Sequence, residues 1–281
     1  MLVTGAAGNT GREVLAALAR RRLPARAAVR DRAHDALPGA AEQVAFDFRD
    51  PATWPAALAG CRAVFLLRPP AIADTRATLV PFIDAARAAG AAQIVFLSVA
   101  GAGENKLVPH HAVEAHLIAS AAPYTLLRPG FFAQNLQDAY RRDITEDDRL
   151  YVPAGRGRVA FVDLRDVAAV AAAAFADPAA HDRQAYTLTG PEAVDFQTVA
   201  ALLATALGRP IRYEAASVLG YVRHLRRRGL GWAQAAVQTV LHVGLRFGQA
   251  EAVDPTLAAL LGRPGHPMRD YIAAHADRWR R

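Results

Sequence analysis

Residues 4–11 read Thr4-Gly5-Ala6-Ala7-Gly8-Asn9-Thr10-Gly11 and follow the short apolar run that starts the chain. Glycines at a spacing of three, between a strand and a helix, are typical of the turn that binds a dinucleotide pyrophosphate. Gly5 permits a tight bend, Gly8 lets the backbone approach the phosphates, and Gly11 lets helix and strand pack closely. The N-terminus of the helix that follows offers N–H groups to the phosphates. The cofactor contacts expected in this turn are Thr4, Gly5, Ala7, Gly8, Asn9, Thr10 and Gly11.

Outward from the turn, short apolar runs alternate with helical patterns. Strand-like runs lie at 1–4, 25–29, 43–46, 63–67, 93–97 and 124–127, and helical patterns at 10–22, 51–59, 74–89 and 109–121. This alternation predicts a Rossmann-like α/β fold, a doubly wound parallel sheet with helices on both faces. Later patterns predict strands at 159–162 and 185–188, a helix at 166–176 and mostly helices after 191. We expect an NAD(P)-binding domain over 1–190 and a C-terminal substrate-capping region over 191–281, packed on that domain.

The end of the second strand bears on the choice of dinucleotide. It reads Ala28-Val29-Arg30-Asp31-Arg32. An NAD site usually carries an acid here that holds the ribose 2′-hydroxyl, whereas an arginine pairs with a 2′-phosphate. Arg30, with Arg32 as a second contact, therefore favours NADP(H). Asp31 keeps NAD(H) open, and a solvated charged loop is the alternative without a ligand.

Further motifs cover most of the chain, namely Phe46-Asp47-Phe48-Arg49-Asp50, Phe96-Leu97-Ser98, the run from Pro123 to Phe132, the run from Phe161 to Ala168, and Tyr186 to Pro191. With the glycine turn and Val29-Arg30-Asp31, they resemble the NmrA-like branch of the atypical short-chain dehydrogenases/reductases. That branch includes NADPH:quinone oxidoreductases and cofactor sensors. The resemblance implies the fold and a dinucleotide, and it leaves the substrate open.

The resemblance also implies roles for single residues. Asp47 and Phe48 match the adenine end, Leu67 and Arg68 the place where the chain wraps the cofactor, and Ser98 the nicotinamide. The stretch from Pro129 to Asn135 matches the loop that lines the nicotinamide and substrate, with Pro129, Gly130 and Phe131 on the cofactor and Phe132 and Asn135 on the substrate. Each has a structural alternative: Asp47 as a turn residue, Ser98 bonded to nearby backbone, and Phe131 and Phe132 in the core.

One departure from the wider family bears on the chemistry. A typical short-chain dehydrogenase carries Tyr-x-x-x-Lys on one helix, where the lysine binds the nicotinamide ribose and the tyrosine passes a proton. If Glu114 is aligned with the glutamate common in this branch, His110 occupies the lysine position and Lys106 the tyrosine position. Without the dyad, direct hydride transfer to a quinone-like or conjugated carbonyl acceptor is favoured over alcohol–ketone conversion. Ser98 and His110 are the candidate catalytic residues, with solvent or His110 as the proton source; for His110 the alternatives are a ribose contact and a merely polar helix residue.

Two other functions stay open: a non-catalytic NAD(P)-sensing regulator, and a tailoring reductase or isomerase of secondary metabolism. Asp163 and Asp166 are interpreted as structural, with Asp166 as a helix N-cap. The Arg223–Arg228 stretch is either a solvated helix face or the entrance for an anionic substrate. No metal site is expected, because the spacing of His110 and His116 does not suit one helix face.

Composition narrows the partners to a small-molecule acceptor. The net charge of +7 invites a nucleic-acid interpretation, but the arginines are scattered and no recognition motif accompanies them. No apolar run reaches the length of a bilayer span, and the chain starts without a signal peptide, so neither a membrane nor secretion is expected. The single cysteine, Cys61, indicates a reducing cytoplasm. A homodimer is left open.

Overall fold

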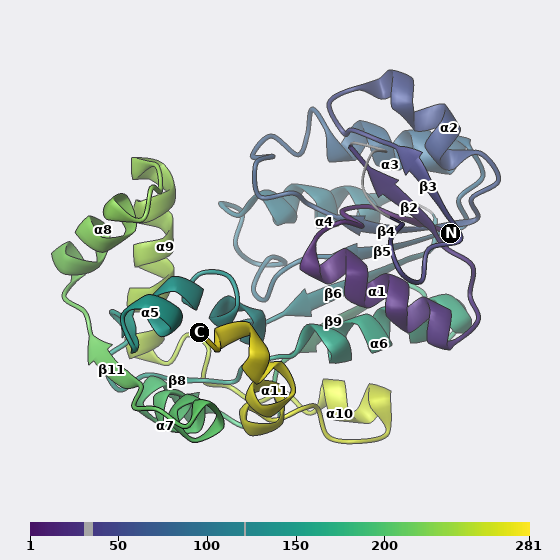
Figure 1. Cartoon of the computed structure of the whole chain (residues 1–281). Coiled ribbons are helices and arrows are strands. Elements are labelled where there is room, and N and C mark those ends of the chain that lie inside the picture. The colour runs from purple at the N-terminus through teal and green to yellow at the C-terminus, as the bar shows by residue number, and fades with distance from the viewer. Residues whose placement is uncertain (31–35, 121) are drawn as a thin grey trace. The chain divides into compact units, whose positions relative to one another are not determined.

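The computed structural model describes residues 1–30, 36–120 and 122–281 (Figure 1). The chain forms two compact units, each assembled from three segments. Unit 1 comprises residues 1–129, 164–188 and 259–262, and unit 2 comprises 130–163, 189–258 and 263–281. The segment 130–163, which precedes the boundary expected at residue 190, thus belongs to unit 2.

Unit 1 is built on a seven-stranded sheet with the order β3-β2-β1-β4-β5-β6-β9, in which every neighbouring pair is parallel. The strands are β1 (Leu2–Val3), β2 (Arg26–Val29), β3 (Glu42–Ala45), β4 (Ala63–Leu67), β5 (Gln93–Leu97), β6 (Tyr124–Pro129) and β9 (Gln184–Leu188). The strand order reverses between β1 and β4, which is where open α/β sheets bind ligands beyond their carboxyl ends. The predicted Rossmann-like sheet is confirmed.

Helices cover both faces of this sheet (Figure 1). They are α1 (Asn9–Arg20), α2 (Trp54–Leu58) after the 3-10 turn Pro51–Thr53, α3 (Leu79–Ala88), α4 (Pro109–Ala119) and α6 (Leu164–Ala176). Helix α1 packs against α6. On the other face, apolar side chains of α2, α3 and α4 form a buried cluster with those of the strands, because apolar residues recur at helical spacing on each helix.

Two helices and one strand have bounds that differ from the sequence prediction. Helix α3 starts at Leu79 and not at Asp74, since Asp74 forms a turn in which its carboxylate accepts from the Ala77 N–H at 3.0 Å. Helix α6 starts at Leu164, so Asp166 is its third residue and the predicted N-cap role is wrong. The strand expected at 159–162 is reduced to β8 (Arg158–Val159).

Unit 2 combines two short sheets with helices. Strand β7 (Arg149–Val152) pairs in parallel with β11 (Arg212–Ala215), and β8 pairs antiparallel with β10 (Val194–Asp195). The helices are α5 (Arg141–Glu146), α7 (Phe196–Leu207), α8 (Val218–Arg227), α9 (Trp232–Gly244) and α11 (Met268–His275), and α10 (Thr256–Leu261) runs from unit 2 into unit 1. Near the C-terminus, the buried Trp279 indole donates to the Leu136 carbonyl at 2.9 Å.

None of the helices in the described ranges is both long and apolar enough to cross a membrane.

Candidate functional site

Two glycines of the turn after β1 are required by their backbone surroundings. Gly5 has φ +64°, in the left-handed region, and a β-carbon there would lie 2.3 Å from Leu67 Cδ2. A β-carbon on Gly11 would lie 2.3 Å from the Gly5 carbonyl oxygen and 2.5 Å from Ala6 Cα. A side chain at Gly11 would separate α1 from the residues after β1, whereas one at Gly5 would strain the left-handed backbone and displace the Leu67 side chain. The close packing predicted for Gly11 is therefore present.

Gly8 differs, because the space beside it is open. It is the N-cap of α1, with φ −80°, which any residue can adopt. Among the described residues, a β-carbon on Gly8 would meet within 4 Å just the Gly5 carbonyl oxygen, at 3.4 Å. The first turn of α1, with Asn9 and Thr10, thus borders the open space beside Gly8, which we call the phosphate cradle. A side chain at position 8 would fill this space, and a phosphate group fits it. The turn suits the pyrophosphate of a dinucleotide.

Arg12, which the sequence analysis did not single out, lies over this turn. Its Nε donates to the Ala7 carbonyl oxygen at 3.0 Å, and the side chain is exposed. Its position directly after the third glycine, in the first turn of α1, was the sequence signal that could have identified Arg12.

Thr4 contributes to the site through the sheet. Its hydroxyl donates to the Phe65 carbonyl at 3.0 Å and accepts from the Leu67 N–H at 2.9 Å, and the side chain is fully buried. Thr4 therefore joins β1 to β4 at the switch point. Its predicted cofactor contact would have to come from its backbone.

At the adenine end, Arg30 follows β2 directly and is exposed. Asp31 and Arg32 lie outside the described residues. Asp47 accepts from the Arg49 N–H at 2.8 Å, as in a turn. Phe48 is buried, edge-to-face with Phe46 at 4.8 Å and with Phe82 at 5.3 Å between ring centroids. The structural alternatives thus describe the Asp47 and Phe48 side chains, and Arg30 keeps an exposed charge at this end.

Arg68 and His110 meet at the carboxyl edge of β4 and β5. Arg68 Nε donates to His110 Nε2 at 3.2 Å, and its Nη1 donates to the Ile72 carbonyl at 2.6 Å. His110 is buried, and burial together with the positive charge of Arg68 lowers its pKa to about 4, against the opposing effect of Glu114. The imidazole is therefore neutral at pH 7 and carries no proton of an imidazolium to give.

Ser98 belongs to a buried ionic network. Its hydroxyl donates to Glu114 Oε1 at 2.5 Å, and Arg128 donates to both Glu114 oxygens, Nε at 3.0 Å and Nη2 at 2.6 Å. Glu114 is 1% exposed, and its hydrogen bonding raises the pKa of Arg128. The network ties α4 to the ends of β5 and β6. The sequence signal for Glu114 and Arg128 was a charge on the apolar face of a helix and another in an apolar strand.

The predicted nicotinamide and substrate loop divides at residue 129, since Pro129 ends β6 in unit 1 and Gly130 begins unit 2. Phe131 packs edge-to-face on Phe161 and His242, with centroid distances of 5.6 and 5.7 Å. Phe132 and Asn135 are half-buried, and the Asn135 N–H donates to the Phe132 carbonyl at 3.2 Å. Phe131 is half-buried and packs against the buried cluster of unit 2.

Behind Phe131, His242 is held in one tautomer. Its Nδ1 lies 2.6 Å from the Gln238 carbonyl oxygen, so Nδ1 carries the hydrogen and Nε2 accepts from the Tyr140 hydroxyl. Burial lowers the pKa of His242 to about 4 and raises the pKa of Tyr140. The pair anchors α9 to the chain that precedes α5.

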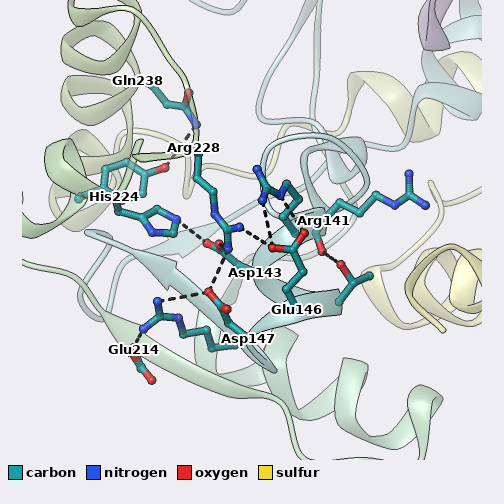
Figure 2. A network of polar contacts seen from close by, with 12 residues as sticks. Arg141, Asp143, Glu146, Asp147, Glu214, His224, Arg228 and Gln238 are labelled. Carbon is teal, nitrogen blue, oxygen red and sulfur yellow. Dashed lines mark hydrogen bonds and ion pairs between the residues drawn. The ribbon is translucent and has the colours of Figure 1, made fainter. Parts of the chain in front are cut away.

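The basic stretch of α8 meets a group of carboxylates (Figure 2). Buried Asp143 accepts from His224 Nε2 at 3.0 Å and from Arg228 Nη2 at 2.8 Å, and Arg228 also pairs with Glu146 and Asp147 at 2.6 and 2.9 Å. His224 and Arg228 therefore tie α5 to α8 and do not form a freely solvated helix face.

Asp163 and His116 also have protein partners. Asp163 accepts from Gln134 Nε2 at 3.1 Å, which agrees with its structural interpretation. His116 lies 2.7 Å from Asp84. Over the described ranges, no three histidine, cysteine or acidic side chains gather in a way that could hold a metal ion.

Comparison with known proteins agrees with this geometry. Residues 5–178 match the NAD(P)H-binding family model. An NAD(P)H azoreductase of Xenophilus azovorans is 34% identical over 98% of both chains. A (4-alkanoyl-5-oxo-2,5-dihydrofuran-3-yl)methyl phosphate reductase of Streptomyces griseus is 33% identical over 99% of this chain and 98% of its own. The NADPH complex of the Escherichia coli quinone oxidoreductase QOR2 is 27% identical, with a TM-score of 0.83 over 97% of this chain and 98% of that one.

The chain also shares its fold with the transcriptional regulator NmrA, at a TM-score of 0.73. The match to the family model spans more than half of the chain, and the most similar of these relatives aligns almost from end to end. The chain therefore belongs to the NAD(P)H-binding family.

Proposed function

We propose that the acceptor of this NAD(P)H-dependent oxidoreductase is a small conjugated molecule, quinone-like or a conjugated carbonyl compound, which is reduced by direct hydride transfer. The observation that carries the proposal is the chemistry at the place of the family's tyrosine and lysine. His110 at the lysine position is buried and neutral, and Lys106 at the tyrosine position is exposed. Neither can replace a phenol activated by a neighbouring ammonium.

Conjugation of the acceptor removes the need for that dyad. When bound, the reduced dinucleotide supplies a hydride from its nicotinamide. A quinone or an enone spreads the resulting negative charge over its own π system, so a proton from water completes the reduction. The task left to the chain is to bind and orient the two ligands. Holding the reacting atoms close together in the right geometry itself increases the rate of hydride transfer.

The residues divide that work. The turn at 4–11, with the open space beside Gly8, would hold the pyrophosphate, and Arg30 would hold the 2′-phosphate that makes NADP(H) the preferred cofactor, with NAD(H) also accepted. Leu67, Arg68, His110 and the backbone near Ser98 would line the nicotinamide half. Pro129, Gly130 and Phe131 would contact the cofactor, and Phe132 and Asn135 the acceptor. In this proposal residues 191–281 cap the substrate.

The relatives support a conjugated acceptor. Their names attach reductase activity to azo compounds, to a quinone and to an oxo-dihydrofuran that bears an alkanoyl group. Each of these names describes an electrophilic π system. We infer the same chemical class for this chain.

The test is a panel of quinones, enones and azo dyes incubated with the purified protein and NADPH, followed at the nicotinamide absorbance. We expect oxidation of NADPH with at least one acceptor class, in stoichiometric ratio to acceptor consumed, and no turnover with simple ketones. Absence of turnover with every conjugated acceptor would refute the proposal.

The same panel examines a second candidate function, a cofactor sensor. The observation that favours a sensor is an intact phosphate turn combined with the missing dyad. A sensor should distinguish oxidised from reduced cofactor in affinity and lack turnover. Turnover that obeys saturation kinetics would reject sensing as the main role.

We also propose that the protein works in the cytoplasm. Its one cysteine, Cys61, is buried and unpaired, so the fold uses no disulfide and needs no oxidising compartment. Recovery of the protein from the membrane or secreted fraction of the native host would contradict this.

The oligomeric state is a separate question. Light scattering of the purified protein decides whether it is a homodimer.

A further inference from the structure

Arg68 is held from two sides at the end of β4. Its Nε donates to His110 Nε2 at 3.2 Å, and its Nη1 donates to the carbonyl oxygens of Pro69 and Ile72 at 3.1 and 2.6 Å. The carbonyls fix the plane of the guanidinium, so the Nε–H points at the imidazole. This arrangement determines how the imidazole can be protonated.

A guanidinium donates hydrogen bonds and accepts none. The nitrogen that faces it, His110 Nε2, must therefore be the acceptor, and the ring hydrogen of the neutral imidazole must be on Nδ1. His110 Nδ1 is buried, and no partner for it exists among the described residues. A buried N–H without an acceptor is costly in a folded protein, and such groups commonly serve a ligand.

His110 lies at the same edge of the sheet as the predicted cofactor site. Leu67, whose side chain touches the position of a Gly5 β-carbon, is the neighbour of Arg68 in the chain. His110 is in the first turn of α4, beyond the carboxyl end of β5, and its ring lies 6.0 Å from the Phe96 ring on that strand. An oxygen of a dinucleotide at this edge is the acceptor that the site can supply.

We propose that Arg68 is a positioning residue that locks His110 as a neutral Nδ1–H donor, that this N–H binds an oxygen of the dinucleotide, and that His110 is not the proton source of the reaction. The identity of the ligand rests on the proposed function. The assignment of the His110 tautomer does not rest on it. The groups that face the ring agree with this assignment. The positive charge of Arg68 and burial both disfavour an imidazolium, and together they outweigh Glu114, one turn further along α4.

The tautomer is measured on the protein without cofactor. In ¹⁵N-labelled protein at pH 7, the His110 ring, assigned by comparison with the His110→Asn spectrum, should show a protonated Nδ1 and an unprotonated Nε2. Arg68→Lys should preserve this pattern, because an ammonium also donates only. Arg68→Met should yield a mixture of tautomers. A protonated Nε2 or an imidazolium in the wild type would overturn the proposal.

The ligand contact is measured by calorimetric titration with NADPH. His110→Leu, which removes the donor, should raise the Kd at least about fivefold. His110→Asn places an amide N–H near the position of Nδ1, and His110→Gln places one near Nε2. We expect His110→Asn to bind NADPH at least about threefold more tightly than His110→Gln.

Two outcomes would sink the assignment while leaving the proposed function intact. One is equal NADPH affinity of wild type and His110→Leu. The other is acceptor reduction by wild type that falls with the loss of a proton between pH 5 and 8 and becomes independent of pH in His110→Asn, since that would make His110 the acid. If instead the wild type neither binds NADPH nor reduces an acceptor, the proposed function fails, and the tautomer measurement still stands.

Discussion

At the scale of single residues, the candidate site separates side chains that the protein has already satisfied from those that it leaves for a ligand. The hydroxyls of Thr4 and Ser98 donate within the protein, and one Asp47 oxygen accepts from a neighbouring N–H. The exposed guanidinium of Arg30 and the buried Nδ1–H of His110 are available. A ligand gains most from Arg30 and the His110 Nδ1–H. To bond with Thr4, Ser98 or Asp47 it would first have to break bonds that the fold already makes.

Arg30 is expected to discriminate between the two dinucleotides. A guanidinium matches the oxygens of the 2′-phosphate with charge-assisted hydrogen bonds, worth about 1.5–3 kcal/mol, or about 10- to 150-fold in affinity. Arg30→Ala should weaken NADPH binding by about that factor and leave NADH binding nearly unchanged. Calorimetric titration of both cofactors measures the difference.

Arg62→Ala is the matched control for Arg30→Ala. Arg62 is also an exposed arginine, but it precedes β4 and so lies at the amino edge of the same sheet. Arg62→Ala should change the affinity for neither NADPH nor NADH. Equal wild-type affinities for NADPH and NADH, or equal losses of both in Arg30→Ala, would show that Arg30 does not contact the phosphate.

At the scale of elements, the β1–α1 turn uses its glycines for two different purposes. Gly11 lets the helix approach the backbone of residues 5 and 6, whereas Gly8 leaves room beside the helix N-terminus. One purpose concerns stability and the other concerns binding, so substitutions should separate them.

Gly11→Ala and Gly8→Ala are expected to have opposite signatures. In Gly11→Ala the new methyl collides with backbone atoms, and such overpacking costs about 1–3 kcal/mol or more of unfolding free energy. Gly8→Ala should keep nearly wild-type stability, because its methyl meets a single atom at 3.4 Å, but should raise the NADPH Kd at least about tenfold by filling the phosphate cradle. Denaturant unfolding and calorimetry give the two readouts. Wild-type NADPH affinity in Gly8→Ala would disprove the cradle.

Helix α9 should be sensitive to acid through His242. In the unfolded chain its pKa lies near 6.5, and in the folded protein burial holds the pKa at about 4. Between these values the unfolded state binds more protons, so the free energy of unfolding should fall as pH falls from about 6.5 to about 4, by up to about 1.4 kcal/mol per pH unit. His110, whose pKa is also lowered to about 4, adds to the slope.

His242→Gln isolates the contribution of α9. Its neutral amide does not titrate. The slope of unfolding free energy against pH over this interval should therefore decrease by at most the contribution of one proton, and the contribution of His110 to the slope should remain. Urea unfolding at pH 5 and pH 7 compares the variant with wild type. An unchanged slope would mean that His242 does not enter the fold in its neutral form.

At the scale of the whole molecule, the sheet was predictable because its signals are local. Glycine spacing and the alternation of apolar runs with helical patterns locate β1, β4, β5 and α1 within a residue or two. The start of α3 was not predictable from periodicity, since the Asp74 turn competes with the first helical turn. Unit 2 was harder still, because segments such as 130–163 and 263–281 join it from distant parts of the sequence.

The candidate site was predictable at the level of residue types and not of their bonds. The sequence placed Arg68 and Ser98 at the ends of neighbouring strands and His110 in the first turn of a helix, as observed. It could not indicate that Glu114 binds the Ser98 hydroxyl, or that Arg68 determines the tautomer of His110, because both depend on side-chain partners 16 and 42 residues apart in sequence.

Cofactor binding should stabilise the molecule as a whole. A ligand that binds the native state alone adds about 2.7 kcal/mol of unfolding free energy at a concentration of 100 times Kd, and about 1.4 kcal/mol more for each further tenfold increase. Denaturant unfolding at a series of NADPH concentrations should follow this logarithmic dependence, with a Kd equal to the calorimetric one. Gly8→Ala should need at least about tenfold more NADPH for the same gain, because its methyl occupies the phosphate cradle. Stabilisation that levels off with rising NADPH would instead indicate that the unfolded chain binds the cofactor as well.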